Sequence, residues 1–581
     1  MTLLEKTIAS IKVPATLPAS SAFSVLAVQD IRFGKLMTAL LRYINITGER
    51  HPAPPQTSVV ISCADHGVAA ESVSAYPPET TLNMMCNYLI AHGGAANAAA
   101  NYVNARLLIV DLGVNADTSA IPGLLHRSIA RGTENMTKGP AMTRTQAVRA
   151  VETGIQIASD CAARGDHCIL PGEMGISNTT SSAAISAAIL GLPPEEVTGR
   201  GANISDERLQ HKIDIVRRAL AVNHPDPRDG IDVLAKVGGF ELGCIAGIIL
   251  GAAAHRMLVI LDGANTTSAA LIAHTIAPHC VHYLLASHVS LTEHSQPHAL
   301  QRMGLPPMLR LDIRLSEAAG ASIALRMLEQ MLKVWKTIDT PVKMCDILPI
   351  PPQKTATEAL PIPPPDSSVM DDAQYRLDNL AKPIHSLGYL ERVAVQLAGI
   401  TRQVCPPVDK TAALLIISDA EEMSPALCGI ISAMTKGNGI DVYLLCTGAA
   451  DTQDISTAAR RIAAEHLLLI LGSIGDHTAA VRAVLHAGAE SGALLLPGDA
   501  AADRIARDYS AEDAALRPYL LHVLPDMITA EIDAPAGIGG LLGLEIVRAA
   551  LHVINDMKTF SEANVAVAID GAGAGRQVRE Q

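Results

Sequence analysis

A glycine-rich segment that could bind an anion follows one predicted strand of the chain. Residues 171–180 read PGEMGISNTT and lead into a predicted helix. Glycines let a ligand approach the backbone closely, and the free amides, hydroxyls and dipole at a helix start favour an anion such as phosphate. An ordinary helix cap by Asn178 or Thr179 would explain the same residues. The candidate anion contacts are Gly175, Ser177, Asn178, Thr179 and Thr180.

Two basic side chains could bind the same anion. Arg200 lies between two glycines, and Lys212 lies two turns into a helix that is predicted to begin near Ser205. An Arg and a Lys placed in this way could hold a phosphate, because both donate charged hydrogen bonds. Solvated surface charges would show the same pattern.

Isolated acidic residues follow two further predicted strands. Glu317 lies in residues 314–320 (RLSEAAG), where a predicted strand passes into a long predicted helix. A Glu in the first turn of a helix usually complements the helix dipole, so its position alone does not indicate chemistry. Asp65, in residues 64–68 (ADHGV), fits either a site or a turn before a capped helix.

No metal site is expected. The twenty histidines, His288 among them, show no metal-ligand spacing, and the ten cysteines include no CxxC. No GxGxxG follows the first predicted strand, which argues against a dinucleotide-dependent dehydrogenase.

Short apolar runs that alternate with amphipathic stretches must position these residues. The runs are residues 57–65, 105–113, 167–172, 257–263, 282–287 and 307–313. Their length and β-branched content suit strands buried on both faces. Alternating strands and helices predict an α/β fold with a doubly wound, mainly parallel sheet and a small helical subdomain. Ligands of such sheets bind beyond the carboxyl ends of the strands, so the residues in the strand-to-helix loops are the first candidates for a site.

A proline-rich segment divides the chain. Residues 349–365 contain seven prolines in seventeen positions, which favours an extended spacer. We therefore expect domains at residues 1–345 and 371–581, joined by a linker at residues 346–370. Apolar runs return at residues 412–419, 441–448, 465–472 and 492–498, so the second domain is predicted to be a shorter α/β copy of the first. It lacks a counterpart of roughly residues 118–254.

Charge and hydropathy restrict the possible partners. A formal charge of -13 without a basic run argues against a surface for nucleic acid or anionic membranes. The apolar run at residues 244–254 is too short to span a bilayer and is predicted to be a buried helix. The first residues lack secretory features and the cysteines are scattered, so a cytoplasmic protein with small-molecule ligands is expected.

Taken together, these segments resemble the nicotinate-nucleotide:dimethylbenzimidazole phosphoribosyltransferases over about residues 25–345. The matching segments occur in the family's order: ADHGVAAESVSAYPPETT, GGAANAAA, PGEMGISNTTSSAA, GRG followed by a Lys, GGFELG, LDGANTTSAAL, SHVS and IRLSEAAGA. The resemblance implies transfer of the phosphoribosyl group of nicotinate mononucleotide to a lower-ligand base, which gives α-ribazole 5'-phosphate and nicotinate for the nucleotide loop of cobalamin. It implies no cofactor.

The resemblance also implies roles for individual residues. Glu317 matches the family's catalytic base, and Glu173 is similar to a second acidic residue that faces the donor. The segment 175–180 with Lys212 resembles the donor-phosphate site. Ser74, Tyr76 and Asn83 fall where the acceptor base is held. Further substrate contacts are expected in the matching segments from Asp65, Arg200, Asp262 and His288.

Departures from the family leave the acceptor open. The family usually has Gly at Ser177, Gly-Thr at Ala318 and Ala319, and Gln at Asn83. Dimethylbenzimidazole, a phenol and an adenine-type base all remain acceptors to be considered. A non-catalytic nucleotide-binding protein is the alternative function, but such a protein would be expected to have lost Glu173 or Glu317.

The second copy is predicted to be non-catalytic. Residues 376–391 (RLDNLAKPIHSLGYLE) resemble the family's N-terminal stretch, which the first copy does not show clearly. This copy has no GEMGxxNTT, and Ala534 or Pro535 stands where the catalytic Glu would be. Members of the family act as dimers whose subunits help to close the active site. The chain is therefore expected to form either a homodimer or an intramolecular pseudo-dimer in which residues 370–565 replace the partner.

Overall fold

The computed structural model describes residues 1–17, 31–290, 292–338, 360–407, 410–419, 422–448, 451–475 and 477–574. Of the linker expected at residues 346–370, residues 346–359 lie outside this description. Residues 360–366 form no helix or strand, and a helix already begins at Ser367.

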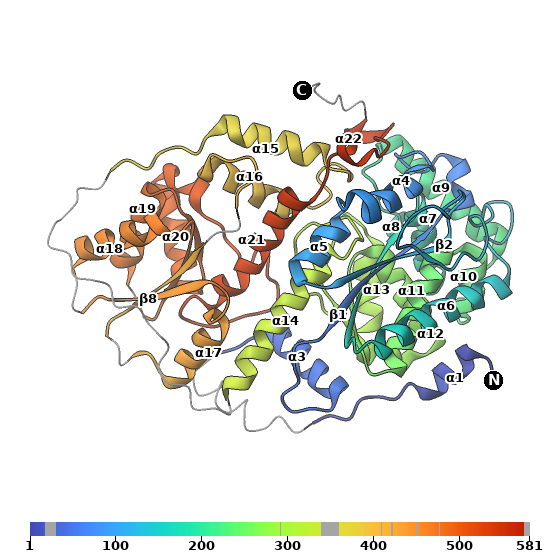
Figure 1. Ribbon diagram of the computed structural model, residues 1–581, viewed down its shortest axis with the longest axis horizontal. Coiled ribbons are helices and arrows are strands. Elements are labelled where there is room, and N and C mark those ends of the chain that lie inside the picture. The colour runs from blue at the N-terminus through green and yellow to red at the C-terminus, as the bar shows by residue number, and fades with distance from the viewer. Residues whose placement is uncertain are drawn as a thin grey trace.

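The first half is a parallel sheet with its covering helices (Figure 1). Its main elements are α1 (Leu3–Ser10), α3 (Gly34–Thr47), β1 (Thr57–Ala64), α4 (Thr80–Cys86), α5 (Ala95–Val103), β2 (Arg106–Gly113), β3 (Leu125–His126), α6 (Arg144–Ala163), β4 (Cys168–Met174), α7 (Asn178–Leu190), α8 (Pro194–Val197), α9 (Asp206–Asn223), α10 (Gly230–Val237), α11 (Phe240–Ala254), β5 (Leu258–Leu261), α12 (Ala264–Ile276), β6 (Leu284–Ala286), α13 (Ser295–Met303) and α14 (Ala319–Ile338).

The strand order is β3-β2-β1-β4-β5-β6, and every pairing is parallel. Helices α11 and α12 cover one face of this sheet, and α5 and α14 cover the other. Helices α7 to α10 pack on one another beside the carboxyl edge as a small helical subdomain. The predicted doubly wound α/β fold is confirmed, and residues 244–254 lie in the buried helix α11.

One predicted strand is wrong. Residues 307–313 make only isolated bridges, from Leu309 to His288 and to Ile528. This segment passes between the first half and a loop of the second half, and each neighbour forms one bridge with it, at Leu309, instead of a ladder. Its apolar side chains are buried by tertiary packing, which imitates the burial pattern of a strand.

A proline in β4 opens the sheet at the point where the candidate site lies. β4 pairs with β5 only at Cys168 and Ile169, and Pro171, which has no N–H, follows this point. Beyond the proline, the N–H of Glu173 donates to the carbonyl of Ser316 (3.0 Å). A Cβ at Gly172 would lie 2.9 Å from that carbonyl oxygen. The Pro-Gly pair therefore lets the segment that carries Glu317 enter beside β4.

The second half holds a smaller parallel sheet (Figure 1). Its main elements are α15 (Ser367–Asn379), α16 (Tyr389–Thr401), β7 (Thr411–Ile417), α17 (Pro425–Thr435), β8 (Ile440–Cys446), α18 (Thr452–Glu465), β9 (Leu468–Ser473), α19 (Thr478–Glu490), β10 (Leu494–Pro497), α20 (Ala500–Glu512), α21 (Ile538–Asp556) and α22 (Phe560–Ala563).

The order of this sheet, β10-β9-β7-β8, is that of the first sheet with two strands removed. Without β3 and β4 the first sheet would read β6-β5-β1-β2. Both missing strands lie within residues 118–254, the part that sequence comparison of the two halves finds absent from the second. The four strands form at the four apolar runs predicted for this half.

The halves share one hydrophobic core. The long helix α21 packs on α5 and α14 of the first half and on β9 and β10 of the second. Its length and composition would allow a membrane span, but 83% of its apolar window is buried inside the fold. A separate apolar cluster lies on the far face of the second sheet. Helix α21 is therefore a core helix that joins the two halves.

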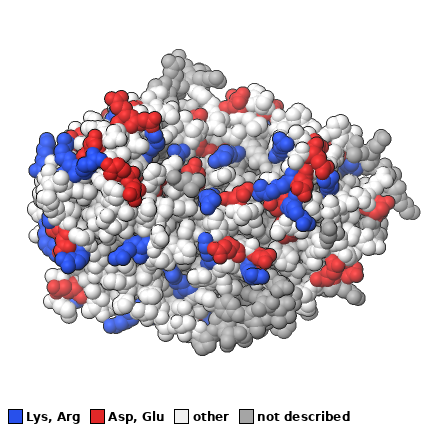
Figure 2. Space-filling model, turned by 180° about the vertical axis from the view of Figure 1, so that it is seen from behind, with Lys and Arg blue, Asp and Glu red and all other residues white. Residues whose placement is uncertain are grey.

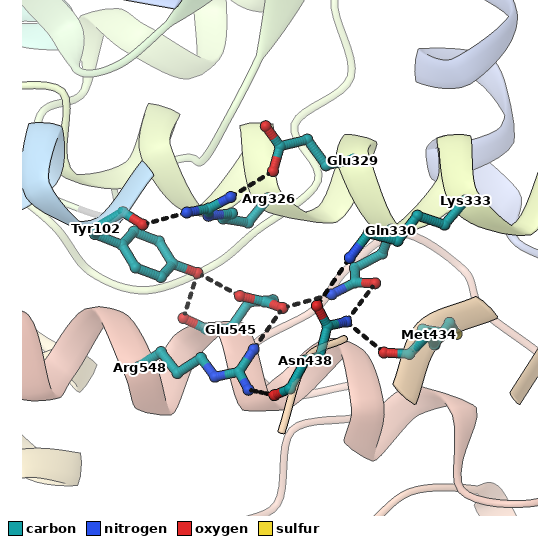
Figure 3. A network of polar contacts seen from close by, with 9 residues as sticks. All are labelled: Tyr102, Arg326, Glu329, Gln330, Lys333, Met434, Asn438, Glu545 and Arg548. Carbon is teal, nitrogen blue, oxygen red and sulfur yellow. Dashed lines mark hydrogen bonds and ion pairs between the residues drawn. The ribbon is translucent and has the colours of Figure 1, made fainter. Parts of the chain in front are cut away.

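Polar contacts reinforce this junction (Figure 3). The buried Glu545 carboxylate of α21 accepts hydrogen bonds from the Tyr102 hydroxyl of α5 (2.8 Å) and the Gln330 amide of α14 (2.8 Å). Lys333 of α14 donates to the side chain of Asn438, between α17 and β8 (2.8 Å). Arg548 donates to Glu545 (3.4 Å) and to the Asn438 carbonyl. The network thus joins α5 and α14 of the first half to α21 and to the α17–β8 connection of the second.

Charges of both signs are interspersed over the described part of the face that Figure 2 shows. This face carries no extended basic surface of the kind that binds nucleic acid.

Candidate active site

A pocket opens at the carboxyl edge of the first sheet, between α7, α9, the start of α14 and two segments of the second half. Residues of the glycine-rich segment, Glu173 to Thr179, line it together with Glu317 and Lys212. From the second half come Ala381, Lys382, Pro383, Phe560 and Val565. Both halves therefore build the same cavity.

Two buried carboxylates line this pocket. Asn265 donates to Glu173 (2.6 Å), as does Asn178, and burial raises the pKa of Glu173 to about 8. Glu317 accepts a hydrogen bond from the N–H of Ala96 (3.2 Å), and burial raises its pKa to about 7. A pKa near neutrality is what a carboxylate needs to take up a proton efficiently at physiological pH.

Asp262 and His288 hold the start of α14 from outside the pocket. The Asp262 carboxylate accepts the N–H of Ala321 (2.9 Å) and lies 3.8 Å from Nδ1 of His288. Both side chains are fully buried, and burial lowers the pKa of His288 to about 4. A neutral imidazole against a carboxylate that caps the helix fixes the backbone next to Glu317. These two residues support the backbone beside Glu317 and do not line the cavity.

The anion side of the pocket is formed by α7 and α9. The helix α7 begins after Ser177, whose φ of 77° is left-handed and would suit glycine better. Lys212 donates to Thr179 Oγ1 (2.8 Å) and to the Gly199 carbonyl (3.0 Å). Burial lowers the pKa of Lys212 to about 8. An ammonium, a helix start and hydroxyls converge here, as a phosphate requires.

Aromatic and apolar side chains form another part of the wall. The rings of Tyr76 and Phe560 are stacked with their centroids 6.3 Å apart. Ser74, Met84 and Val565 also line the cavity. A flat aromatic molecule could bind against such a surface. Beside it, the buried Lys382 pairs with Glu391 (2.8 Å).

The structure brings most of the residues identified in the sequence into this one cavity. The lining includes Glu173, Glu317, Ser74, Tyr76, Gly175, Ser177, Asn178, Thr179, Arg200 and Lys212. Five others lie outside the lining: Asp65, Asn83, Thr180, Asp262 and His288. Asp65 accepts the N–H of Asn115 (2.8 Å), and Asn83 accepts the N–H of Ala566 (3.3 Å), so both support neighbouring loops.

Several lining residues were not identified from the sequence. Asn265 had a signal, because the tetrapeptide NTTS occurs both at residues 178–181 and at 265–268, and the two asparagines bind the same carboxylate. Glu293, which accepts the Gly201 N–H (2.7 Å), and Phe560 had none. Their positions depend on chain segments that meet only in the folded molecule.

One cluster among the described residues has the spacing of metal ligands. The side chains of Asp378, His385 and Glu391 place ligand atoms within 4.8 Å of one another. The ammonium of Lys382 already pairs with Glu391 there, and its charge opposes the binding of a second cation.

The comparisons with known proteins agree on one family. A family model described as phosphoribosyltransferase matches residues 18–342 and 362–424. The nicotinate-nucleotide–dimethylbenzimidazole phosphoribosyltransferase of Geobacter metallireducens is 46% identical over 308 residues, 53% of this chain and 86% of the relative. That of Roseiflexus sp. is 43% identical and is covered to 95%, with 58% of this chain. A crystal structure of CobT from Thermus thermophilus matches with a TM-score of 0.51 and 38% identity, over 57% of this chain and 95% of that one.

Proposed function

Because the chain belongs to the nicotinate-nucleotide–dimethylbenzimidazole phosphoribosyltransferase family, we propose that its pocket transfers the phosphoribosyl group of nicotinate mononucleotide to an aromatic base. The products are the α-ribazole 5'-phosphate of that base and nicotinate. The observation that carries the proposal is the placement of two buried carboxylates, Glu173 and Glu317, in one pocket with a phosphate-type helix start.

The chemistry needs a base and no acid. The pyridine nitrogen of the donor is cationic, so the electron pair of the breaking bond to C1′ leaves it neutral. An imidazole nitrogen of the acceptor forms the new bond to C1′ from the opposite face. Its other N–H becomes acidic in the process and needs a proton acceptor.

Glu317 takes that proton in our proposal. Its carboxylate is held by the N–H of Ala96, and its backbone lies next to the helix start that Asp262 caps. The pKa of about 7 that burial produces makes it largely ionised just above neutrality. A phenolic acceptor could lose its proton to the same group.

Glu173 is assigned to the donor side. Burial raises its pKa, but a cationic pyridinium beside it would lower that pKa again and favour the ionised form. A negative group there also stabilises the positive charge that develops on the ribose. Lys212, Arg200 and the segment 175–179 would bind the donor phosphate, and Ser74 and Tyr76 the acceptor.

The second half completes this site in cis in our proposal, as the second protomer of a dimer would. The stacked Tyr76 and Phe560 support it, since one ring comes from each half. Specific activity should then stay constant on dilution while sedimentation reports a monomer. Loss of activity on dilution would instead indicate that a homodimer is required.

The reaction is assigned to a reducing compartment such as the cytoplasm. The cysteines that the structure describes are all free, which supports this assignment.

The direct test is a product assay on the full chain. The protein is incubated with nicotinate mononucleotide and a panel of benzimidazoles, phenols and adenine, and the products are weighed by mass spectrometry. A ribosyl phosphate adduct of one acceptor class, with release of nicotinate, is expected. Failure to form any adduct with the whole panel would refute the proposed function.

A further inference from the structure

A segment near the end of the described chain leads away from the pocket wall. After α22, residues 564–570 run from the wall residue Val565 to Asp570; we call them the C-terminal strap. The N–H of Ile569 donates to the Ala75 carbonyl (2.8 Å), and the N–H of Ala566 donates to Asn83 (3.3 Å). The strap is thus attached to the loop and the helix that follow β1.

Arg208 of α9 fastens the end of this strap. Its Nε lies 2.8 Å from the Asp570 carboxylate, which also accepts hydrogen bonds from the N–H and hydroxyl of Ser205. The same guanidinium donates to the carbonyls of Ser72 (2.7 Å) and Ser74 (2.9 Å). One side chain therefore joins three elements: the strap, the start of α9 and the loop that carries Ser74 and Tyr76.

This ion pair is better enclosed than ordinary surface pairs. The side chains of Arg208 and Asp570 are 24% and 19% exposed, whereas Arg217 and Glu195, where α9 meets α8, are each 50% exposed. Enclosure weakens solvent screening, so a fork-shaped guanidinium can fix the geometry of what it holds. Arg208 and Asp570 are absent from the pocket lining and act only through the residues they hold.

We propose that the Arg208–Asp570 pair is a clamp that positions the acceptor side of the pocket and thereby sets its affinity and size limit for the aromatic acceptor. This inference rests on the proposed function, in which Ser74 and Tyr76 bind the acceptor, and on the stacking of Phe560 against Tyr76. The clamp holds the loop of Ser74 and Tyr76 on one side and the strap that continues from Phe560 and Val565 on the other. Releasing it widens the space between these two walls.

The test compares Asp570→Asn with the matched control Glu195→Gln in the full chain. Asp570→Asn should raise KM for dimethylbenzimidazole about tenfold, a tenfold change being about 1.4 kcal/mol. KM for nicotinate mononucleotide should change less than about twofold, because Lys212 keeps both of its hydrogen bonds. The relative activity toward acceptors larger than dimethylbenzimidazole should rise. Glu195→Gln should change neither constant.

A double-mutant cycle with Arg208→Met tests whether the two residues act as one. Adding Asp570→Asn to Arg208→Met should not raise KM for the acceptor further. An unchanged acceptor KM in Asp570→Asn, an equal rise in both KM values, or additive effects in the double variant would overturn the clamp. A wild-type chain that makes no product with any acceptor would instead count against the proposed function.

Discussion

Each half of the chain ends its sheet with a long helix whose start is held by a buried aspartate, but the two helix starts differ in chemistry. In the first half, Asp262 accepts the N–H of Ala321, and Glu317 lies just before α14. In the second, Asp499 accepts the N–H groups of Ser473 (2.7 Å) and Gly537 (3.1 Å). Residues 534–537 (APAG) before α21 contain no carboxylate. A buried aspartate therefore holds the helix start in both halves, although the two aspartates follow strands that do not correspond, β5 and β10. Glu317 has no counterpart directly before α21.

Among the described strands, the second half also lacks a counterpart of β4, and this absence extends the difference from Glu317 to Glu173. Glu173 and Asn178, which we assign to the donor side, belong to β4 and the start of α7. The second sheet, as far as the structure describes it, has no counterpart of β4. The second half instead packs against the first half and helps to line its pocket. Its helix α21 lies in the shared core, and its Phe560 forms part of the pocket wall. The second half thus lacks the two carboxylates but keeps the surfaces that pack against the first half.

The largest effect should follow from making the first half resemble the second at Glu317. Glu317→Gln removes the proton acceptor while keeping the size of the side chain, so kcat should fall about 10²–10⁴-fold. Binding of nicotinate mononucleotide, measured by calorimetry, should stay nearly unchanged. Asp533→Asn, next to the corresponding helix start in the second half, is the control and should leave kcat unaltered. Retained turnover in Glu317→Gln would remove the assigned role.

Disrupting the polar junction between the halves should lower the free energy of unfolding more than it lowers the catalytic activity. Glu545→Ala removes the carboxylate that accepts hydrogen bonds from the Tyr102 hydroxyl and the Gln330 amide. The hydroxyl keeps the backbone carbonyl of residue 545 (3.0 Å), but the buried amide loses its acceptor, so the free energy of unfolding should fall by about 3 kcal/mol. Urea unfolding of the full chain measures this. The exposed Glu512, paired with Arg482, provides the control, and Glu512→Ala should cause no measurable change. Equal stabilities of the two variants would contradict a junction held by Glu545.

The pH dependence of activity should reflect the carboxylate that only the first half has. Burial raises the pKa of Glu317 to about 7 and that of Glu173 to about 8, so the ionised forms of both are lost as pH falls. The value of kcat/KM should therefore drop by about tenfold or more per unit below pH 7. Burial lowers the pKa of Lys212 to about 8, so kcat/KM for the donor should also fall above that value. A bell-shaped profile is expected. An activity that stays constant from pH 5 to 7 would exclude a titrating base at this position.

The same comparison shows where sequence was informative. Strands buried on both faces are continuous apolar runs, so β1, β2, β4 to β6 and all four strands of the second sheet were predictable. Residues 307–313 have the same pattern without forming a strand, because their burial comes from both halves at once. The position of Glu173 followed from its place at the carboxyl end of β4, and that of Glu317 from its place just before a long helix, although the segment before it, residues 307–313, forms no strand. The supporting roles of Asn83, Asp262 and His288 did not, since a side chain's partners across the fold leave no local trace.

The wall supplied by the second half was the least predictable part of the site. Lys382 and Phe560 both lie beyond the proline-rich segment, far along the chain from Glu317. The resemblance predicts that residues 370–565 could replace a partner subunit at the active site, but it does not identify either side chain as part of the wall. Only the docking of α21 against α5 and α14 brings them to the pocket. A split site of this kind follows from the way the two halves pack and not from any motif.

The smallest effect should come from exchanging residues at two helix starts with left-handed backbone. Ser177 before α7 has a φ of 77°, and Gly537 before α21 has a φ of 76°. Ser177→Gly removes the steric cost of a side chain there, together with a buried hydroxyl, and should stabilise the chain by about 1 kcal/mol. Gly537→Ala adds that cost and should destabilise by at least the same amount, because its Cβ would also meet Gly472 at 3.2 Å. Urea unfolding should therefore shift in opposite directions for the two variants, and a shift in the same direction would show that local backbone strain does not govern either site.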